Sequence, residues 1–251
     1  MMHNQALKIV VCLFFVLLAC KKADERACFK SSGTNSKLEF KINPNIDSLF
    51  LFDNLEYEFF KSEEAKINIE GGQNVISFID AQEDNGKLTI SNENKCNFLR
   101  NLSQRIKVQI YLPTLNYLRY EGSSSFTMMD TVESGALRVF IRDGAGPVKL
   151  KVNASYLETT VSHGVGNFEI EGKANACYLA CNTNSFCDTR KLKIQEWIKV
   201  LSNTGGDMLV NTDGAKLNVI INRNGNVKYT GQYTELETQI KGEGELIALD
   251  E

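Results

Sequence analysis

A short glycine-rich pattern recurs along the second half of the chain. Its seven copies are Gly122-Ser123-Ser124, Gly144-Ala145-Gly146, Gly164-Val165-Gly166, Asn182-Thr183-Asn184, Thr204-Gly205-Gly206, Arg223-Asn224-Gly225 and Gly242-Glu243-Gly244. The third residues of successive triplets lie 22, 20, 18, 22, 19 and 19 residues apart. So narrow a period indicates a solenoid, in which each repeat is one structural unit that stacks on the next.

Alternating apolar residues flank each triplet. Two residues after the third position, all seven copies are apolar: Phe126, Val148, Phe168, Phe186, Met208, Val227 and Leu246. Two residues further on stand Met128, Leu150, Ile170, Asp188, Val210, Tyr229 and Ala248, which continue an inward face with period two and predict an irregular rung at Asp188. Another alternating segment precedes each triplet, as in Leu137-x-Val139-x-Ile141. Each repeat is therefore predicted to be strand, tight corner, strand.

These units predict an all-β fold, a right-handed parallel β-helix whose coils stack about 4.8 Å apart. An antiparallel sandwich is the alternative, but it does not require matched residues at one corner. Residues 37–120 lack the triplet and keep the alternation, as in Leu38-x-Phe40-x-Ile42. We therefore expect a single domain over 37–250, with atypical leading β coils or a β cap over 37–120 and the repeats over 121–250.

The N-terminus has the pattern of an export signal. Lys8 precedes an apolar run over residues 9–19, which is too short to cross about 30 Å of hydrocarbon as a helix. The run ends in Ala19-Cys20, which resembles the lipobox of bacterial lipoproteins. We predict a signal peptide over 1–19, lipid attachment at Cys20 and a tether over 20–36, which would place an outer-membrane lipoprotein in the periplasm or at the cell surface. An ordinary secretory signal and a buried strand are the alternatives.

Five further cysteines remain in such a mature chain: Cys28, Cys96, Cys177, Cys181 and Cys187. Their spacing leaves the disulfide pairing open, and the last three do not have the spacing of a zinc site, so no metal is expected. Cys177, Leu179 and Cys181 alternate with period two, which predicts that all three lie buried on one face of a strand.

Composition and motifs weigh against nucleic acid binding and against catalysis. A net charge of −3 with a pI of about 5.6 lacks the basic surface that a phosphate backbone requires. The glycine pairs open no helix, so no dinucleotide cofactor is expected. His163 has no accompanying Gly-x-Ser-x-Gly motif. A carbohydrate-active β-helix enzyme, of the polysaccharide lyase or hydrolase type, is the alternative function, and it would need its acids to cluster; the candidates are Asp143, Asp188, Asp207 and Asp213.

The outward face of one strand offers candidate ligand contacts. If Ile194, Ile198 and Val200 point inward, then Lys193, Trp197 and Lys199 point outward. An exposed tryptophan beside lysines could stack on a sugar or anchor an envelope or surface protein, unless a neighbouring loop covers it. Self-association into an envelope scaffold through the open sheet edges is a further alternative. The late charges, which are the acidic residues near the C-terminus, are expected to disfavour strand pairing at that end; they are Glu243, Glu245, Asp250 and Glu251.

The repeat and four further segments resemble a known family. The segments are Ile67-Asn68-Ile69-Glu70-Gly71, Gly86-Lys87-Leu88-Thr89-Ile90, Ile106-Lys107-Val108 and Tyr111-Leu112-Pro113-Thr114-Leu115, which leads to Gly122. Over residues 37–250 the pattern is similar to the auto-transporter adhesin head GIN domain family, with departures at Asn182-Thr183-Asn184 and Arg223-Asn224-Gly225. The resemblance implies a right-handed β-helix, a lipoprotein of Bacteroidetes-type bacteria, an adhesin-like or structural binding role, and no catalytic residues.

Overall fold

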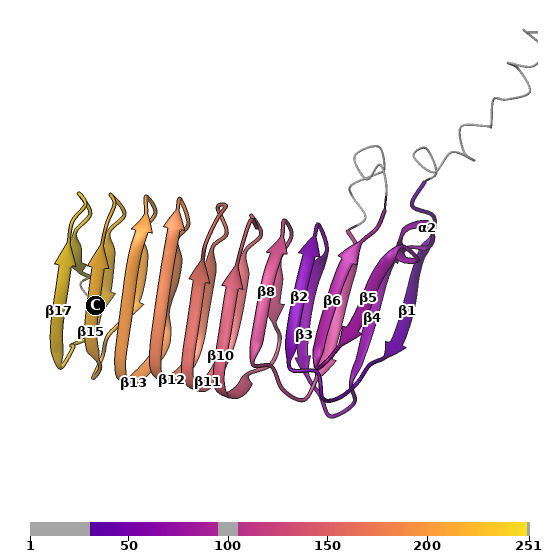
Figure 1. Cartoon of the computed structure of the whole chain (residues 1–251), viewed down its shortest axis with the longest axis horizontal. Coiled ribbons are helices and arrows are strands. Elements are labelled where there is room, and N and C mark those ends of the chain that lie inside the picture. The colour runs from indigo at the N-terminus through magenta and orange to yellow at the C-terminus, as the bar shows by residue number, and fades with distance from the viewer. Residues whose placement is uncertain (1–30, 95–104, 250–251) are drawn as a thin grey trace, which may run out of the picture.

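The computed structural model describes residues 31–94 and 105–249, which form a mostly β solenoid of about seven turns with a curled mixed sheet at its N-terminal end (Figure 1). The predicted all-β solenoid is confirmed. Right-handed winding remains a prediction, in line with the strong preference of parallel β crossovers for that hand. In the described part of the chain, no helix is long and apolar enough to cross a membrane. Residues 1–30, which include Cys20 and the expected signal peptide, lie outside the described residues.

Two sheets face each other across the core. Sheet A contains the strands that precede a corner: in spatial order these are β5 (Ile79–Asp84), β6 (Lys87–Asn92), β2 (Ser48–Asp53), β8 (Tyr117–Gly122), the C-terminal parts of β10 (Val132–Ile141), β11 (Val148–Val161), β12 (Phe168–Thr183) and β13 (Cys187–Thr204), then β15 (Lys216–Ile221) and β17 (Glu235–Ile240). Sheet B contains the strands that follow a corner, together with the antiparallel strands β1 and β4. In spatial order these are β1 (Asn35–Lys41), β4 (Lys66–Gly72), β7 (Lys107–Leu112), β3 (Glu56–Lys61), β9 (Phe126–Met128), the N-terminal parts of β11 to β13, then β14 (Met208–Asn211), β16 (Val227–Thr230) and β18 (Leu246–Ala248).

Each coil turns in two different ways. At the glycine corners, at the top in Figure 1, the chain leaves sheet A and enters sheet B. At the opposite edge, which we call the bend edge, β11, β12 and β13 curve from sheet B into sheet A without interruption. The corners demand glycine because the coils come close there: a Cβ added to Gly146 would lie 1.4 Å from the Ser124 carbonyl oxygen.

The inward rows form one continuous hydrophobic core, and they correct one part of the sequence alignment. The buried column after the corner contains Cys187 in place of Phe186, and the next column contains Thr189 in place of Asp188. Phe186 is 47% exposed. The fourth corner is one residue longer than its triplet implied, and a slip of one residue moves a strand's side chains to the other face. The predicted irregularity is present, because β12 and β13 change register between Glu169 and Glu171.

Residues 37–120 form both of the expected features, atypical coils and antiparallel capping strands. β1 and β4 pair antiparallel, β4 continues antiparallel onto β7, and β5 pairs antiparallel with β6. The coil made of β2 and β3 lies between the coil made of β6 and β7 and the coil made of β8 and β9. The first complete coil in the sequence is therefore stacked between two later ones, which the spacing of sequence motifs could not reveal.

Polar side chains link the coils near the corners. The Asn222 side-chain amide donates to Asn203 Oδ1 at 2.6 Å, and the Asn203 amide donates to Asn182 Oδ1 at 3.0 Å. Asn182 and Asn203 are half-buried and Asn222 is exposed, so these bonds satisfy partly buried polar groups within the stack. The predicted cysteine column is confirmed: Cys177 and Cys181 are buried, and together with Cys187 they are free thiols. Cys28 and Cys96 lie outside the described residues.

Candidate binding faces of the solenoid

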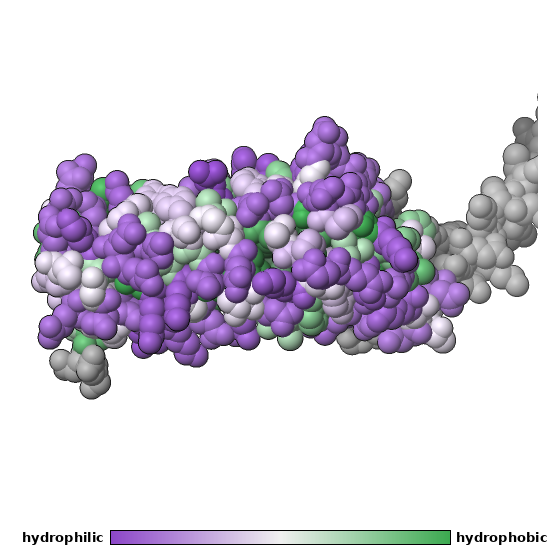
Figure 2. Space-filling view, turned by 90° about the horizontal axis from the view of Figure 1, so that it is seen from below, coloured by the Kyte–Doolittle hydropathy of each residue, from purple (hydrophilic) through white to green (hydrophobic). Residues whose placement is uncertain are grey.

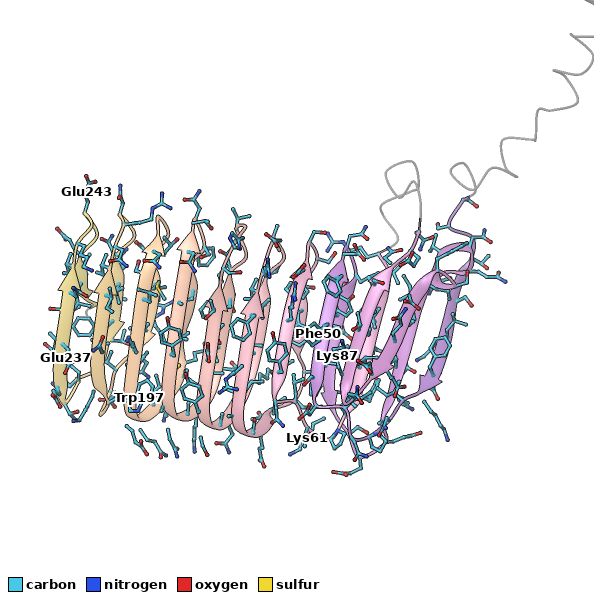
Figure 3. All side chains as sticks on the ribbon, in the orientation of Figure 1. Phe50, Lys61, Lys87, Trp197, Glu237 and Glu243 are labelled. Atoms are coloured by element: carbon cyan, nitrogen blue, oxygen red, sulfur yellow. The ribbon has the colours of Figure 1, made fainter. Side chains whose placement is uncertain are left out.

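Aromatic side chains cluster on the outward face of sheet A. We call this set the aromatic stripe; it runs from β2 to β13 and consists of Phe50, Phe52, Tyr117, Phe140, Tyr156, Tyr178 and Trp197. Phe50 stacks on Tyr117 with ring centroids 5.3 Å apart, and Tyr117 lies 5.6 Å from Phe140. These rings lie on consecutive rungs: Phe50 and Phe140 are both in register with Arg119 of β8, and Tyr117 is the neighbouring outward position on that strand. Figure 3 shows Phe50 beside Lys87, whose amine lies 5.3 Å from the ring centroid, and Trp197 at the lower end of its strand.

A β-bulge directly precedes Trp197 in β13. Ala174 pairs with Ile194 and Ala176 pairs with Trp197, so Gln195 and Glu196 together oppose a single residue of β12. Bulges of this kind commonly re-aim a side chain beside a functional site. The Trp197 ring is 38% exposed, and its centroid lies 6.2 Å from that of Tyr156, two rungs away. Burial raises the pKa of the Tyr156 hydroxyl above its ordinary value, so both rings present neutral, partly covered surface.

A shallow depression of about 240 Å³ adjoins Trp197. It is lined by Trp197, Ile198, Lys199, Lys216, Leu217, Asn218, Glu235 and Glu237. Lys216 forms an ion pair with Glu235 at 2.7 Å, whereas Lys199 has no ion pair with any described residue. Trp197 and Lys199 therefore offer a ring face and a cation on the same surface.

The predicted site residues are brought together only in part. Trp197 and Lys199 both point outward and line the depression, as expected from the sequence. Lys193 points outward on the bend edge, next to Lys173 of β12, and does not line the depression. Figure 2 views the bend edge and shows hydrophilic side chains over most of it. Tyr178 and Tyr156 were not predicted from the sequence, although they precede Trp197 by 19 and 41 residues, close to one and two coil lengths.

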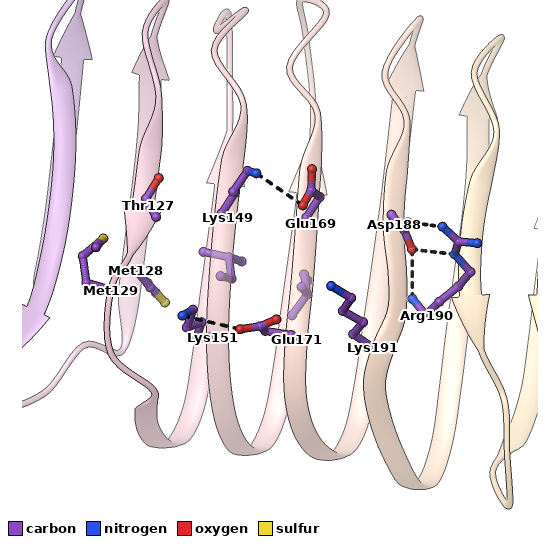
Figure 4. Close-up of a pocket in the computed structure, with 12 residues that line it drawn as sticks. Thr127, Met128, Met129, Lys149, Lys151, Glu169, Glu171, Asp188, Arg190 and Lys191 are labelled. Atoms are coloured by element: carbon purple, nitrogen blue, oxygen red, sulfur yellow. Dashed lines mark hydrogen bonds and ion pairs between the residues drawn. The ribbon is translucent and has the colours of Figure 1, made fainter.

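Sheet B presents a different surface, a groove of about 680 Å³ that crosses four rungs (Figure 4). Its walls carry paired charges: Lys149 with Glu169 at 3.6 Å, Lys151 with Glu171 at 3.6 Å, and Asp188 with Arg190 at 2.6 Å. The hydrogen bonds from Arg190 hold the pKa of the Asp188 carboxyl below its ordinary value. This groove was not predicted from the sequence, although lysine and glutamate recur there at the coil spacing.

The four candidate catalytic acids do not converge. Asp143 lies in a corner beside Arg142, at 3.4 Å, and Asp213 lies at the bend edge after β14. Asp188 belongs to the groove on sheet B. Asp207 directly precedes β14 and forms an ion pair with Lys228 at 2.6 Å. Burial raises the pKa of the Asp207 carboxyl, but Lys228 and Asn226 lower it by more, so the net shift is downward. His163 is exposed in a corner. Among the described residues, no three His, Cys, Asp or Glu side chains are grouped as metal ligands.

Comparison with known proteins identifies the family. The family model described as "Putative auto-transporter adhesin, head GIN domain" matches residues 45–232. The chain belongs to this adhesin GIN-domain family.

The fold is similar to a crystal structure described as a putative adhesin from Bacteroides fragilis NCTC 9343, with a TM-score of 0.79 and 19% identity over 87% of this chain and 99% of that one. Two further crystal structures described as putative adhesins also resemble it. That from Parabacteroides merdae ATCC 43184 has a TM-score of 0.62 and 15% identity, covering 87% of this chain and 97% of that one. That from Parabacteroides distasonis ATCC 8503 has a TM-score of 0.61 and 15% identity, covering 87% and 99%. No curated protein matches the chain.

Proposed function

We propose that this GIN-domain protein is a lipid-anchored component of the cell envelope that uses its β-solenoid as an adhesin-like binding module, and that it is not an enzyme. One observation carries the proposal: the outward face of sheet A bears a stripe of partly exposed rings, whereas the outward charges of the groove on sheet B largely neutralise one another in pairs. Aromatic side chains supply large contact area at low entropic cost, and they dominate the energetics of recognition surfaces.

The anchor rests on the sequence around Cys20. A single lipid-modified cysteine at the start of the mature chain would hold the solenoid at a membrane and leave its faces free for a glycan or an envelope or surface protein. Replacement of Cys20 by serine should move the protein from the membrane fraction to the soluble fraction. Recovery of the unmodified parent chain as a soluble, unlipidated protein would contradict the anchor and leave the binding role standing.

Binding can be measured through tryptophan fluorescence, since Trp197 is the single tryptophan in the sequence. Titration with an array of envelope and host-surface glycans, followed by the quenching or shift of Trp197 fluorescence, should yield at least one saturable ligand. Trp197→Ala should weaken that binding at least about tenfold when measured by a label-free method, which corresponds to the loss of one binding hot spot.

A matched control distinguishes binding at this surface from nonspecific binding to exposed aromatic residues. Phe186 is also an exposed aromatic residue, at 47%, but it lies at a corner away from sheet A. Phe186→Ala should leave binding unchanged. Equal losses in the two variants, or no loss in Trp197→Ala, would show that the stripe near Trp197 is not the binding face.

A further inference from the structure

The C-terminal end of the solenoid is open. Within the described part of the chain, β17 and β18 each pair with a neighbouring strand on one side only. Leu236 and Ile240 are in register with Leu217 and Ile221, which are buried in the inward row, yet they are 39% and 49% exposed. No described coil covers them, and Figure 1 shows β17 as the last strand of the stack. An uncovered edge with apolar inward residues can template the addition of another strand.

The free edge of β17 has a defined set of hydrogen-bonding groups. The Lys241 N–H donates to the Ile221 carbonyl at 2.8 Å, so Lys241 points its backbone donor towards β15. Successive residues of a strand point their backbone groups to opposite sides. Leu236, Thr238 and Ile240 therefore direct their N–H and C=O groups to the free edge, where another strand could accept and donate.

The sequence of β17 is complementary to itself when two copies run antiparallel. With Thr238 on the two-fold axis, Leu236 lies opposite Ile240 on the inward side. On the outward side, Glu235 lies opposite Lys241 and Glu237 lies opposite Gln239. Placing the axis on Glu237 instead would bring two glutamates face to face, which is destabilising. An axis on Gln239 would also pair Glu237 with Lys241, but it would set Leu236 opposite Gly242, so the apolar pairs favour the axis on Thr238.

We propose that two copies of this protein dimerise tail to tail through an antiparallel β17–β17 pairing centred on Thr238. Such an interface is isologous and closes after two subunits. A head-to-tail chain is disfavoured because the opposite edge of sheet A is β5, whose Asp80, Glu83 and Asp84 would meet the glutamates of β17. Glu243 lies at the last corner, after β17, and so leaves the free edge of that strand accessible (Figure 3). Asp250 and Glu251 lie outside the described residues.

The dimer would also alter how the protein binds. A two-fold axis perpendicular to sheet A leaves the outward faces of both copies on the same side, so the two aromatic stripes would form one extended surface. A repetitive ligand could then engage both copies, with a gain in avidity and no new type of contact. The dimer itself does not depend on the proposed adhesin role.

The test is sedimentation velocity of the purified protein over a dilution series, compared with Thr238→Pro. Proline removes only the N–H that faces the free edge, so the ladder within the chain keeps its bonds. The parent protein should show a reversible monomer–dimer equilibrium, whereas the variant should be monomeric with a melting temperature within a few degrees of the parent. A parent that stays monomeric throughout, a variant that still dimerises, or a series of larger species would overturn the closed dimer.

Charge reversal tests the register independently of proline. Lys241→Glu should weaken dimerisation several-fold to about tenfold, since each dimer contains two Glu235–Lys241 pairs. Adding Glu235→Lys should restore it, with melting curves recorded because Glu235 also binds Lys216 within the chain. Lys193→Glu, at an exposed lysine of the bend edge, makes the same change of charge and should have no effect. Failure of the double variant to recover would rule out this register.

Discussion

At the scale of single residues, close approach of the backbones at the corners decides which positions must be glycine. A Cβ on Gly146 would lie 1.4 Å from the Ser124 carbonyl oxygen, so Gly146→Ala must push two corners apart. We expect a loss of about 2–3 kcal/mol in the free energy of unfolding, measured by urea denaturation. Gly135→Ala is the control, because a Cβ there meets nothing within 4 Å; it should change stability by less than about 1 kcal/mol. Equal effects of the two variants would contradict the packing argument.

A second residue-scale prediction concerns pH. Burial raises the pKa of the Glu58 carboxyl, but hydrogen bonds from Lys107 at 2.8 Å and Gln109 at 2.9 Å lower it by a larger amount. The pKa in the folded protein therefore lies below the ordinary value of 4.5. The stabilisation is therefore fully present above the unfolded pKa and is lost as the pH falls through the folded one. Glu58→Gln should cost about 1–3 kcal/mol near pH 7 and much less near pH 3, by urea denaturation at both values. A cost that does not change with pH would show that the charge is not the source.

Much of the residue pattern was predictable from the sequence, because the coil period repeats each inward position. Inward Cys177 and Cys181 and outward Trp197 follow from alternation alone, whereas Cys187 was not predicted to face inward. Phe186 and Asp188 were misplaced because the Asn182-Thr183-Asn184 corner lacks the glycine that marks the register. Side chains alternate between the two faces of a strand, so one extra residue in the corner assigns each of them to the wrong face. The neighbours of Trp197 were missed because they come from other coils, so they emerge only when the repeats are aligned in space.

At the scale of elements, β13 is the most irregular strand of the stack, and its bulge can be tested by deletion. Removing Glu196 leaves Ile194-Gln195-Trp197-Ile198, which matches Ala154-Ser155-Tyr156-Leu157 of β11 position by position. We expect a folded protein that loses no more than about 1–2 kcal/mol. Removing Lys199 instead shifts the parity of Val200 and the residues after it, and should destabilise the protein by more than about 3 kcal/mol. Thermal melts of both deletions would decide, and similar melts would mean that register is not what holds β13 in place.

At the scale of the whole molecule, each coil contacts only its neighbours along most of the stack, so the repeat predicts that a complete coil can be removed. Deleting residues 207–225 joins Gly206 to Asn226 and removes β14 and β15, while each inward position meets its equivalent one coil later. The buried row Ile198, Leu217 then becomes Ile198, Leu236 without a change of face. We expect a cooperatively folding protein, shorter by about 4.8 Å and slightly less stable through the loss of one stacking interface. An 18-residue deletion with its junction inside sheet A, residues 200–217, joins Lys199 to Asn218, which are both outward; it turns the following side chains to the wrong face and should fail to fold. Circular dichroism melts and small-angle scattering would separate the two results. Failure of the 19-residue deletion would mean that the later coils depend on contacts beyond their nearest neighbours. The N-terminal coils should not tolerate such an excision, because β2 and β3 lie between coils formed later in the sequence, and their removal would leave a gap in the stack.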